Sequence, residues 1–152
     1  MLEKSTVLNS EFTTDFLSKI LVDEYGLFLQ TKVAYWNFEY SDFYCRNRLF
    51  EIQSAKLFLI SEEIGRQIIA LGHYVVMSNE DFFLNSNLNE VNYKNWSKQE
   101  TTKKIMENHL KIKNKIEEWS SLVKNDVDKS TYVLIDKIIF NHKEMIKELK
   151  LT

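Results

Sequence analysis

The side chains whose types and spacing best suit chemistry lie on one predicted helix, which runs from about residue 42 to residue 71. Asn47, Glu51, Glu62 and Arg66 fall within roughly 100° of arc on that helix, because an α-helix advances about 100° per residue. Polar side chains that border a core need partners, such as a metal ion, one another or a second subunit. The role of this polar row is the main question that the sequence poses.

Four long helices would have to position this row. Ser10 is a candidate cap for the first helix, which follows a non-helical lead at residues 1–9. Asp42 would cap the second helix and Gly72 would end it, after a turn at residues 38–41. The core seam of the second helix has a seven-residue spacing and consists of Phe43, Phe50, Leu57, Ile64 and Leu71. Gly26, inside the first helix, predicts a close approach of another helix.

The second half of the chain shows the same pattern after a long connection at residues 73–96. A short helix capped by Ser78 or Asn79 is expected within that connection. A third helix would begin at a capping box formed by Ser97 and Glu100, and a fourth would begin at Asp128. Their predicted core faces are Ile105, His109, Ile112, Ile116, Trp119 and Val123, then Ile135, Ile138, His142, Met145 and Leu149.

Composition agrees with one all-α domain. The 152 residues include no proline, three glycines and 44% apolar residues, so the chain is suited to long helices rather than to many turns. The formal charge of −2 provides no global attraction to nucleic acid. The sequence has no cationic signal peptide and no apolar run of about 18–20 residues, which predicts a cytoplasmic protein without membrane association.

Several landmarks resemble the Dps or mini-ferritin family, the DNA-binding proteins from starved cells. The landmarks on the first two helices are Trp36–Asn37, Phe43 and Leu49–Phe50–Glu51 at matching spacing. Further similar stretches lie at residues 22–32, 70–72, 78–82, 108–110, 128–131 and 141–144, so the resemblance covers nearly the whole chain. It implies a ferritin-like four-helix bundle with a short extra helix between helices 2 and 3. It also implies a shell of twelve subunits that oxidises and stores iron.

In that family the ferroxidase site lies between two subunits, one of which supplies two histidines and the other an Asp and a Glu. Carried over by position, the histidines fall on Tyr35 and Asn47, the Asp falls on Glu62 and the Glu falls on Arg66. A further acidic position falls on Glu51. The resemblance therefore implies an iron site at positions where most ligands are replaced.

The chemistry of these replacements decides what the site could do. Iron(II) takes imidazole or carboxylate donors, whereas Asn47 offers only a weak carbonyl oxygen. The Tyr35 phenol would have to lose a proton that phenols hold at neutral pH, and the Arg66 cation has no lone pair to donate. Only Glu51 and Glu62 remain good ligand types. Two hypotheses follow: a residual metal site that uses these carboxylates, or a salt-bridge and hydrogen-bond row between subunits.

Other candidate sites are less specific. By resemblance, Asp126 and Asp128 lie near an acidic threefold pore, although Val133 occupies the position of a usual pore Asp. His109 and His142 lie on apolar stripes and are interpreted as hydrogen-bonded core histidines. No Glu-x-x-His pair, which larger ferritins use inside the bundle, precedes any histidine.

The functional hypotheses are of two classes. The first is a mini-ferritin of iron homeostasis and oxidative-stress protection with an impaired or lost ferroxidase centre. The second is a non-catalytic structural or interaction shell, nucleoid-associated or mixed with an active paralogue. DNA binding would lack a polybasic tail, since Glu3 balances Lys4 and the C-terminus offers only Lys147 and Lys150 against Glu148.

Overall fold

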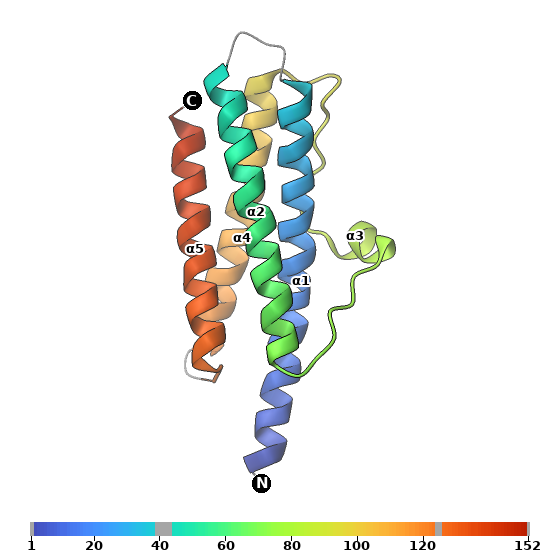
Figure 1. Cartoon of the computed structure of the whole chain (residues 1–152), viewed down its shortest axis with the longest axis vertical. Helices are drawn as coiled ribbons and strands as arrows, with labels where there is room; N and C mark the ends of the chain where they lie inside the picture. The colour runs from blue at the N-terminus through green and yellow to red at the C-terminus, as the bar shows by residue number, and fades with distance from the viewer. Residues whose placement is uncertain (1, 39–43, 124–125, 152) are drawn as a thin grey trace.

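The four long helices of the chain stand side by side as a bundle (Figure 1). The computed structural model describes residues 2–38, 44–123 and 126–151, which contain helices and no strand. The helices are α1 (Leu2–Asn37), α2 (Tyr44–Ala70), α3 (Asn79–Asn85), α4 (Lys98–Val123) and α5 (Lys129–Lys150). The short helix α3 lies beside α1, outside the bundle, in the connection between α2 and α4 (Figure 1). The predicted all-α, four-helix fold with one short extra helix is confirmed.

The predicted core faces are buried. Phe50, Leu57 and Ile64 of the α2 seam are completely buried, and Leu71 packs partly buried against them. Phe43 and the proposed cap Asp42 lie outside the described residues. All the predicted core residues of α4 and α5 are buried, including both histidines. Burial of an apolar side chain contributes about 1.5–3 kcal/mol, so this continuous core is the main source of stability.

The first helix begins earlier than predicted. It starts at Leu2, so the expectation of a non-helical lead at residues 1–9 with Ser10 as the cap is wrong. No glycine or proline precedes Ser10 to interrupt a helix. The Ser10 hydroxyl instead donates to the Leu71 carbonyl oxygen (3.1 Å) and accepts from His73 Nε2 (3.0 Å). It thus ties α1 to the end of α2.

The predicted end of α2 and the predicted starts of α3 and α4 agree with the structure. Gly72 has φ 86°, and the backbone N–H groups of Gly72 and His73 donate to the carbonyls of Ile69 and Ile68, which closes α2. Ser78 caps α3 in a capping box with Asp81. The box predicted at the start of α4 is present, with the Ser97 N–H 2.6 Å from Glu100 and the Glu100 N–H 3.2 Å from the Ser97 hydroxyl.

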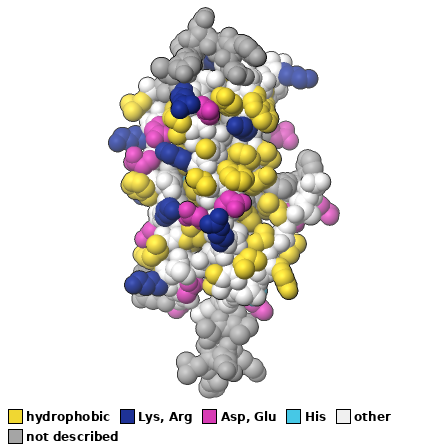
Figure 2. All heavy atoms as spheres, in the orientation of Figure 1, with side chains coloured by type: hydrophobic (Ala, Val, Ile, Leu, Met, Phe, Trp, Pro, Cys, Tyr) yellow, Lys and Arg dark blue, Asp and Glu magenta, His cyan; other side chains and the backbone are white. Residues whose placement is uncertain are grey.

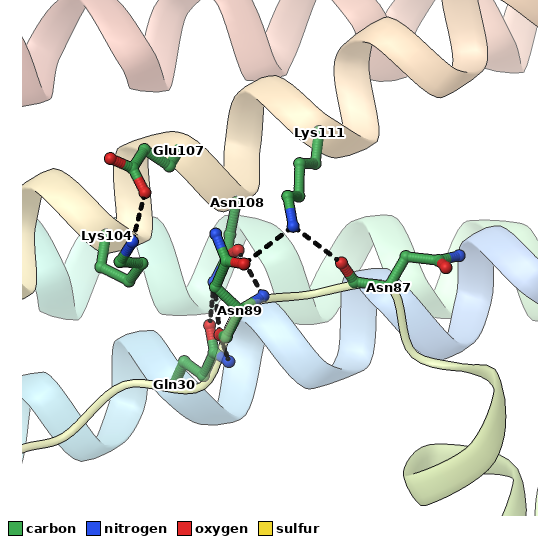
Figure 3. Close-up of polar contacts among 7 residues, drawn as sticks. All are labelled: Gln30, Asn87, Asn89, Lys104, Glu107, Asn108 and Lys111. Carbon is green, nitrogen blue, oxygen red and sulfur yellow. Dashed lines mark hydrogen bonds and ion pairs between the residues drawn. The ribbon is translucent and has the colours of Figure 1, made fainter.

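The long connection is held on the bundle by a partly buried amide network (Figure 3). Asn108 of α4 accepts from the Asn89 N–H (2.9 Å) and donates to Gln30 of α1 (2.7 Å). Gln30 donates to the Asn89 carbonyl oxygen (2.9 Å), and Lys111 donates to the Asn89 side chain (2.8 Å). Because backbone groups removed from water need partners, the bonds to the Asn89 N–H and carbonyl oxygen hold this part of the connection against α1 and α4.

Gly26 accommodates this connection rather than a helix crossing. A Cβ atom at Gly26 would lie 3.3 Å from Leu88 Cδ1 and 3.9 Å from the Ser86 hydroxyl. The predicted close approach is therefore present, but the neighbour is the connection between α3 and α4, and the expectation of a helix there is wrong.

We expect Asp128→Ala to destabilise the fold by about 1 kcal/mol, because Asp128 caps α5 by accepting from the Thr131 N–H (3.1 Å). Burial opposes ionisation of this carboxylate, but hydrogen bonds from Ser130 and Thr131 lower its pKa. The stabilisation should therefore be present above the unfolded-state pKa and be lost as pH falls through the folded-state pKa. Urea unfolding at pH 7 measures the change, with exposed Asp126→Ala as the control; equal effects of both variants would contradict the capping role.

Candidate functional site

The two acidic side chains of the polar row on α2 lie in separate ion pairs: Glu62 pairs with Arg66, and Glu51 pairs with Arg48. Glu62 and Arg66 are one turn apart, with Arg66 Nη2 3.9 Å from Glu62 Oε2, and their side chains are 50% and 78% exposed. At this distance and exposure the ion pair is loose and contributes little within one chain. Both side chains are therefore available to further partners.

The other pair lies nearer the start of α2. Glu51 accepts from Arg48 Nη1 at 2.7 Å, so its charge is already compensated within one turn. Asn47 is half-buried, and its Oδ1 atom is buried without a hydrogen-bond partner among the described residues. An unpaired buried acceptor is unfavourable by about 1–3 kcal/mol.

One chain does not bring these side chains together into a metal site. Glu51 and Glu62 are eleven positions apart, which separates them by about 16 Å along α2. Tyr35, from α1, is partly buried against the core and has Lys32 Nζ 4.9 Å from its ring centroid. No group of three His, Cys, Asp or Glu side chains within the described ranges is arranged to hold a metal ion.

A groove adjoins the Glu62–Arg66 pair. It has a volume of about 440 Å³, and its apolar wall includes Leu21, Ile69 and Met77. In the orientation of Figure 1, hydrophobic side chains gather on the face formed by α1 and α2, with acidic and basic side chains among them (Figure 2). Four large apolar side chains of α2 are 41–60% exposed: Ile52, Phe58, Leu59 and Ile69. An exposed apolar face of this kind is typical of a protein interface.

The two aspartates near the start of α5 have different environments. Asp128 is the helix cap, and Gln67 of α2 donates to its neighbours Ser130 and Thr131 at 2.9 Å. Asp126 is exposed, with its N–H bonded to the Val123 carbonyl oxygen. The cap explains Asp128 within one chain, and the pore role of both residues stays a prediction.

The structure also reveals a functional candidate that the sequence analysis missed. Glu24 of α1 is completely buried and lies 2.6 Å from His142, which in turn contacts His109. Both histidines are confirmed as hydrogen-bonded core residues, but their buried acidic partner was not predicted. The only signal was that Glu24 falls one turn after Ile20 and three residues before Leu27, on the core side of α1.

No described helix combines the length and the apolar character that crossing a membrane requires.

Comparison with known proteins identifies the fold. No family model and no curated protein matches the sequence. Among solved structures, Dps from Thermosynechococcus elongatus superposes with a TM-score of 0.84 at 17% identity, over 95% of this chain and 92% of that one. The archaeal Dps homologue from Halobacterium salinarum gives 0.84 at 18% identity, over 93% and 79%. A dodecameric thioferritin of Bacteroides fragilis, a bacterioferritin-related protein, gives 0.85 at 15% identity, over 99% and 91%. The chain therefore has the ferritin-like fold of the Dps proteins.

We expect the Glu62–Arg66 pair to contribute no more than about 0.5 kcal/mol within one chain, because both side chains are largely exposed. A double-mutant cycle of Glu62→Ala and Arg66→Ala, measured by urea unfolding, isolates the coupling energy. The exposed pair of Asp15 and Lys19, which has the same i,i+4 spacing and a 3.2 Å contact, is the matched control. A coupling well above 1 kcal/mol would contradict a purely intrachain pair and would show that assembly adds a partner.

Proposed function

We propose that this chain is a Dps-like shell protein of iron storage and oxidative-stress protection whose own ferroxidase centre is lost or impaired. One observation carries the proposal. The Arg66 guanidinium lies one turn after Glu62, with 3.9 Å between Nη2 and Oε2, at the position where the family resemblance expects the second carboxylate. A permanent cation without a lone pair repels iron(II) and cannot bind it.

Assembly into a shell is the first part of the proposal. The exposed apolar side chains on the α1–α2 face need a cover, and a second copy of the chain would provide one. The structurally similar thioferritin is dodecameric, and we propose twelve copies for this protein as well. Sedimentation velocity of the purified protein tests this step independently of any iron chemistry.

The second part concerns what Arg66 does at the subunit contact. In the resembling family the metal is bound by residues of two subunits. The equivalent contact here would bring Tyr35 and Asn47 of one copy near Glu62 and Arg66 of another. The guanidinium supplies the positive charge that a metal ion would otherwise bring to Glu62, and it offers five N–H donors to acceptors at the contact. The former metal position would then be a salt-bridge and hydrogen-bond row.

A non-catalytic interaction shell is the second candidate function. The apolar groove beside Glu62 and Arg66 favours it, since that surface could equally receive a different chain. A mixed shell with an active paralogue would combine both functions, because the paralogue would supply complete ligand sets. Binding to the nucleoid is a further form of this second candidate, and a salt-sensitive gel shift would reveal it.

We predict that the assembled wild-type protein oxidises iron(II) in air no faster than buffer alone, because Glu51 and Glu62 lack the additional donors that a centre requires. Absorbance of ferric species after iron(II) addition measures the rate, with assembly verified on the same sample. Oxidation well above the buffer rate, with iron retained by the shell, would overturn the loss of the centre.

The triple variant Tyr35→His, Asn47→His and Arg66→Glu should restore oxidation above the buffer rate, since it returns imidazole and carboxylate donors to the replaced positions. The Glu62→Ala version of the triple variant is the matched control and should lose the restored activity. An assembled triple variant that remains inactive would contradict the assignment of these positions.

A further inference from the structure

A chain of three buried polar side chains joins three helices in the core. Glu24 of α1, His142 of α5 and His109 of α4 are all completely buried. Glu24 Oε1 lies 2.6 Å from His142 Nε2, and His142 Nδ1 lies 2.8 Å from His109 Nδ1. These residues are separate from the polar row on α2, and the proposed function does not use them.

The two contacts limit how many protons Glu24, His142 and His109 can hold together. An imidazole nitrogen donates when it is protonated and accepts when it is not. The contact between His109 Nδ1 and His142 Nδ1 therefore needs one proton and excludes a second. If both rings were cationic, two N–H groups would face each other at 2.8 Å, and neither would have an acceptor. While this hydrogen bond persists, only one of the two rings can carry a charge.

The unpaired atoms at the two ends of the Glu24–His142–His109 series favour a neutral His109. His109 Nε2 and Glu24 Oε2 are buried and have no hydrogen-bond partner among the described residues. A proton on His109 Nε2 would be a buried, unpaired N–H, which is unfavourable. Burial, together with the neighbouring His142 ring, lowers the pKa of His109 well below its usual value. His142 has the Glu24 carboxyl group as the partner of its other ring nitrogen.

Several other charged groups of the surrounding helices are engaged with one another. The pairs that connect two helices are Asp23 with Lys115, Glu117 with Lys143, Glu148 with Lys56, and Glu63 with Lys137. Glu117 also pairs with Lys113 of its own helix. The α2 side chains Glu62 and Arg66 are largely exposed and pair with each other. The protonation of the bundle centre therefore rests on Glu24, His142 and His109.

We propose that Glu24, His142 and His109 form a pH-sensitive latch, which holds α1, α5 and α4 together at neutral pH and is forced open in acid. In the unfolded chain each histidine meets water and takes up a proton near pH 6.5. The folded latch accepts at most one of these two protons. Below about pH 6.5 the unfolded chain therefore binds one proton more than the folded chain, and stability falls as pH falls.

Urea unfolding of the full chain between pH 5 and 8, at constant protein concentration and ionic strength, tests the latch. Below about pH 6.5, each fall of one pH unit should raise the unfolding constant of the wild type. This rise should exceed the rise of the His109→Gln variant by up to tenfold per pH unit. His73→Gln is the matched control, because it removes one histidine at a partly buried site bonded to Ser10 and should retain the wild-type slope. Equal slopes in wild type and His109→Gln would overturn the proposal.

A second measurement covers the case in which His109→Gln does not fold. The chain has three histidines, so carbon-13 labelling of histidine in His73→Gln leaves two signals. One of them should keep its neutral chemical shift from pH 8 down to the onset of unfolding, and normal titration of both in the folded protein would overturn the latch.

Zinc(II) at one equivalent should leave the unfolding midpoint unchanged. A zinc-induced rise in wild type that His109→Gln lacks would overturn the latch in favour of a metal site.

Discussion

The structure depends on the rule that a polar group removed from water must find a partner inside the protein. At the bundle centre a carboxylate on α1 meets an imidazole on α5, which meets an imidazole on α4, all without exposure to solvent. A buried carboxylate without a partner is unfavourable by several kcal/mol, so Glu24 and His142 must lie opposite each other. Apolar contacts tolerate small shifts along a helix, whereas hydrogen bonds of 2.6–2.8 Å do not. The contacts among Glu24, His142 and His109 therefore fix the relative positions of α1, α5 and α4.

The same rule accounts for the connection between α2 and α4. Leu88, Val91 and Tyr93 of this segment pack partly buried against the core. The segment is also held by amide groups that Gln30 and Asn108 present from two different helices (Figure 3). Asp23 extends the attachment, since it accepts from the Asn87 N–H (3.0 Å) and pairs with Lys115 (3.2 Å). Adjacent acidic residues on α1 thus have different tasks: Asp23 anchors the connection, and Glu24 anchors the core.

The polar row on α2 also has incomplete partners in a single chain. The Glu62–Arg66 contact is loose, and Asn47 has an unpaired buried oxygen. These side chains border an exposed apolar face, so a neighbouring subunit would satisfy the polar and the apolar surface together. Substitution of a carboxylate by arginine changes such a contact from one that a metal ion bridges into one that the protein's own cation can bridge.

Local patterns were sufficient to determine much of this protein. The seven-residue seam of α2, the faces of α4 and α5, and the caps at Ser78, Ser97 and Asp128 depend on helical periodicity and on hydrogen bonds within one turn, which neighbouring residues specify. The types of the residues at the polar row also follow from sequence alone, and with them the poor ligand chemistry of Asn47 and Arg66.

Tertiary structure decided what depends on residues far apart in the chain. The local sequence predicts Ser10 as a helix cap, but its hydroxyl forms hydrogen bonds with residues 61 and 63 positions away, at the end of α2. Gly26 reads as a helix-crossing site, but its neighbour is the α3–α4 connection. The partnership of Glu24 with His142 spans 118 positions, and no local pattern encodes it. The physical reason is that a side chain's type sets the kind of partner it needs, while only the packing of the helices selects which partner it meets.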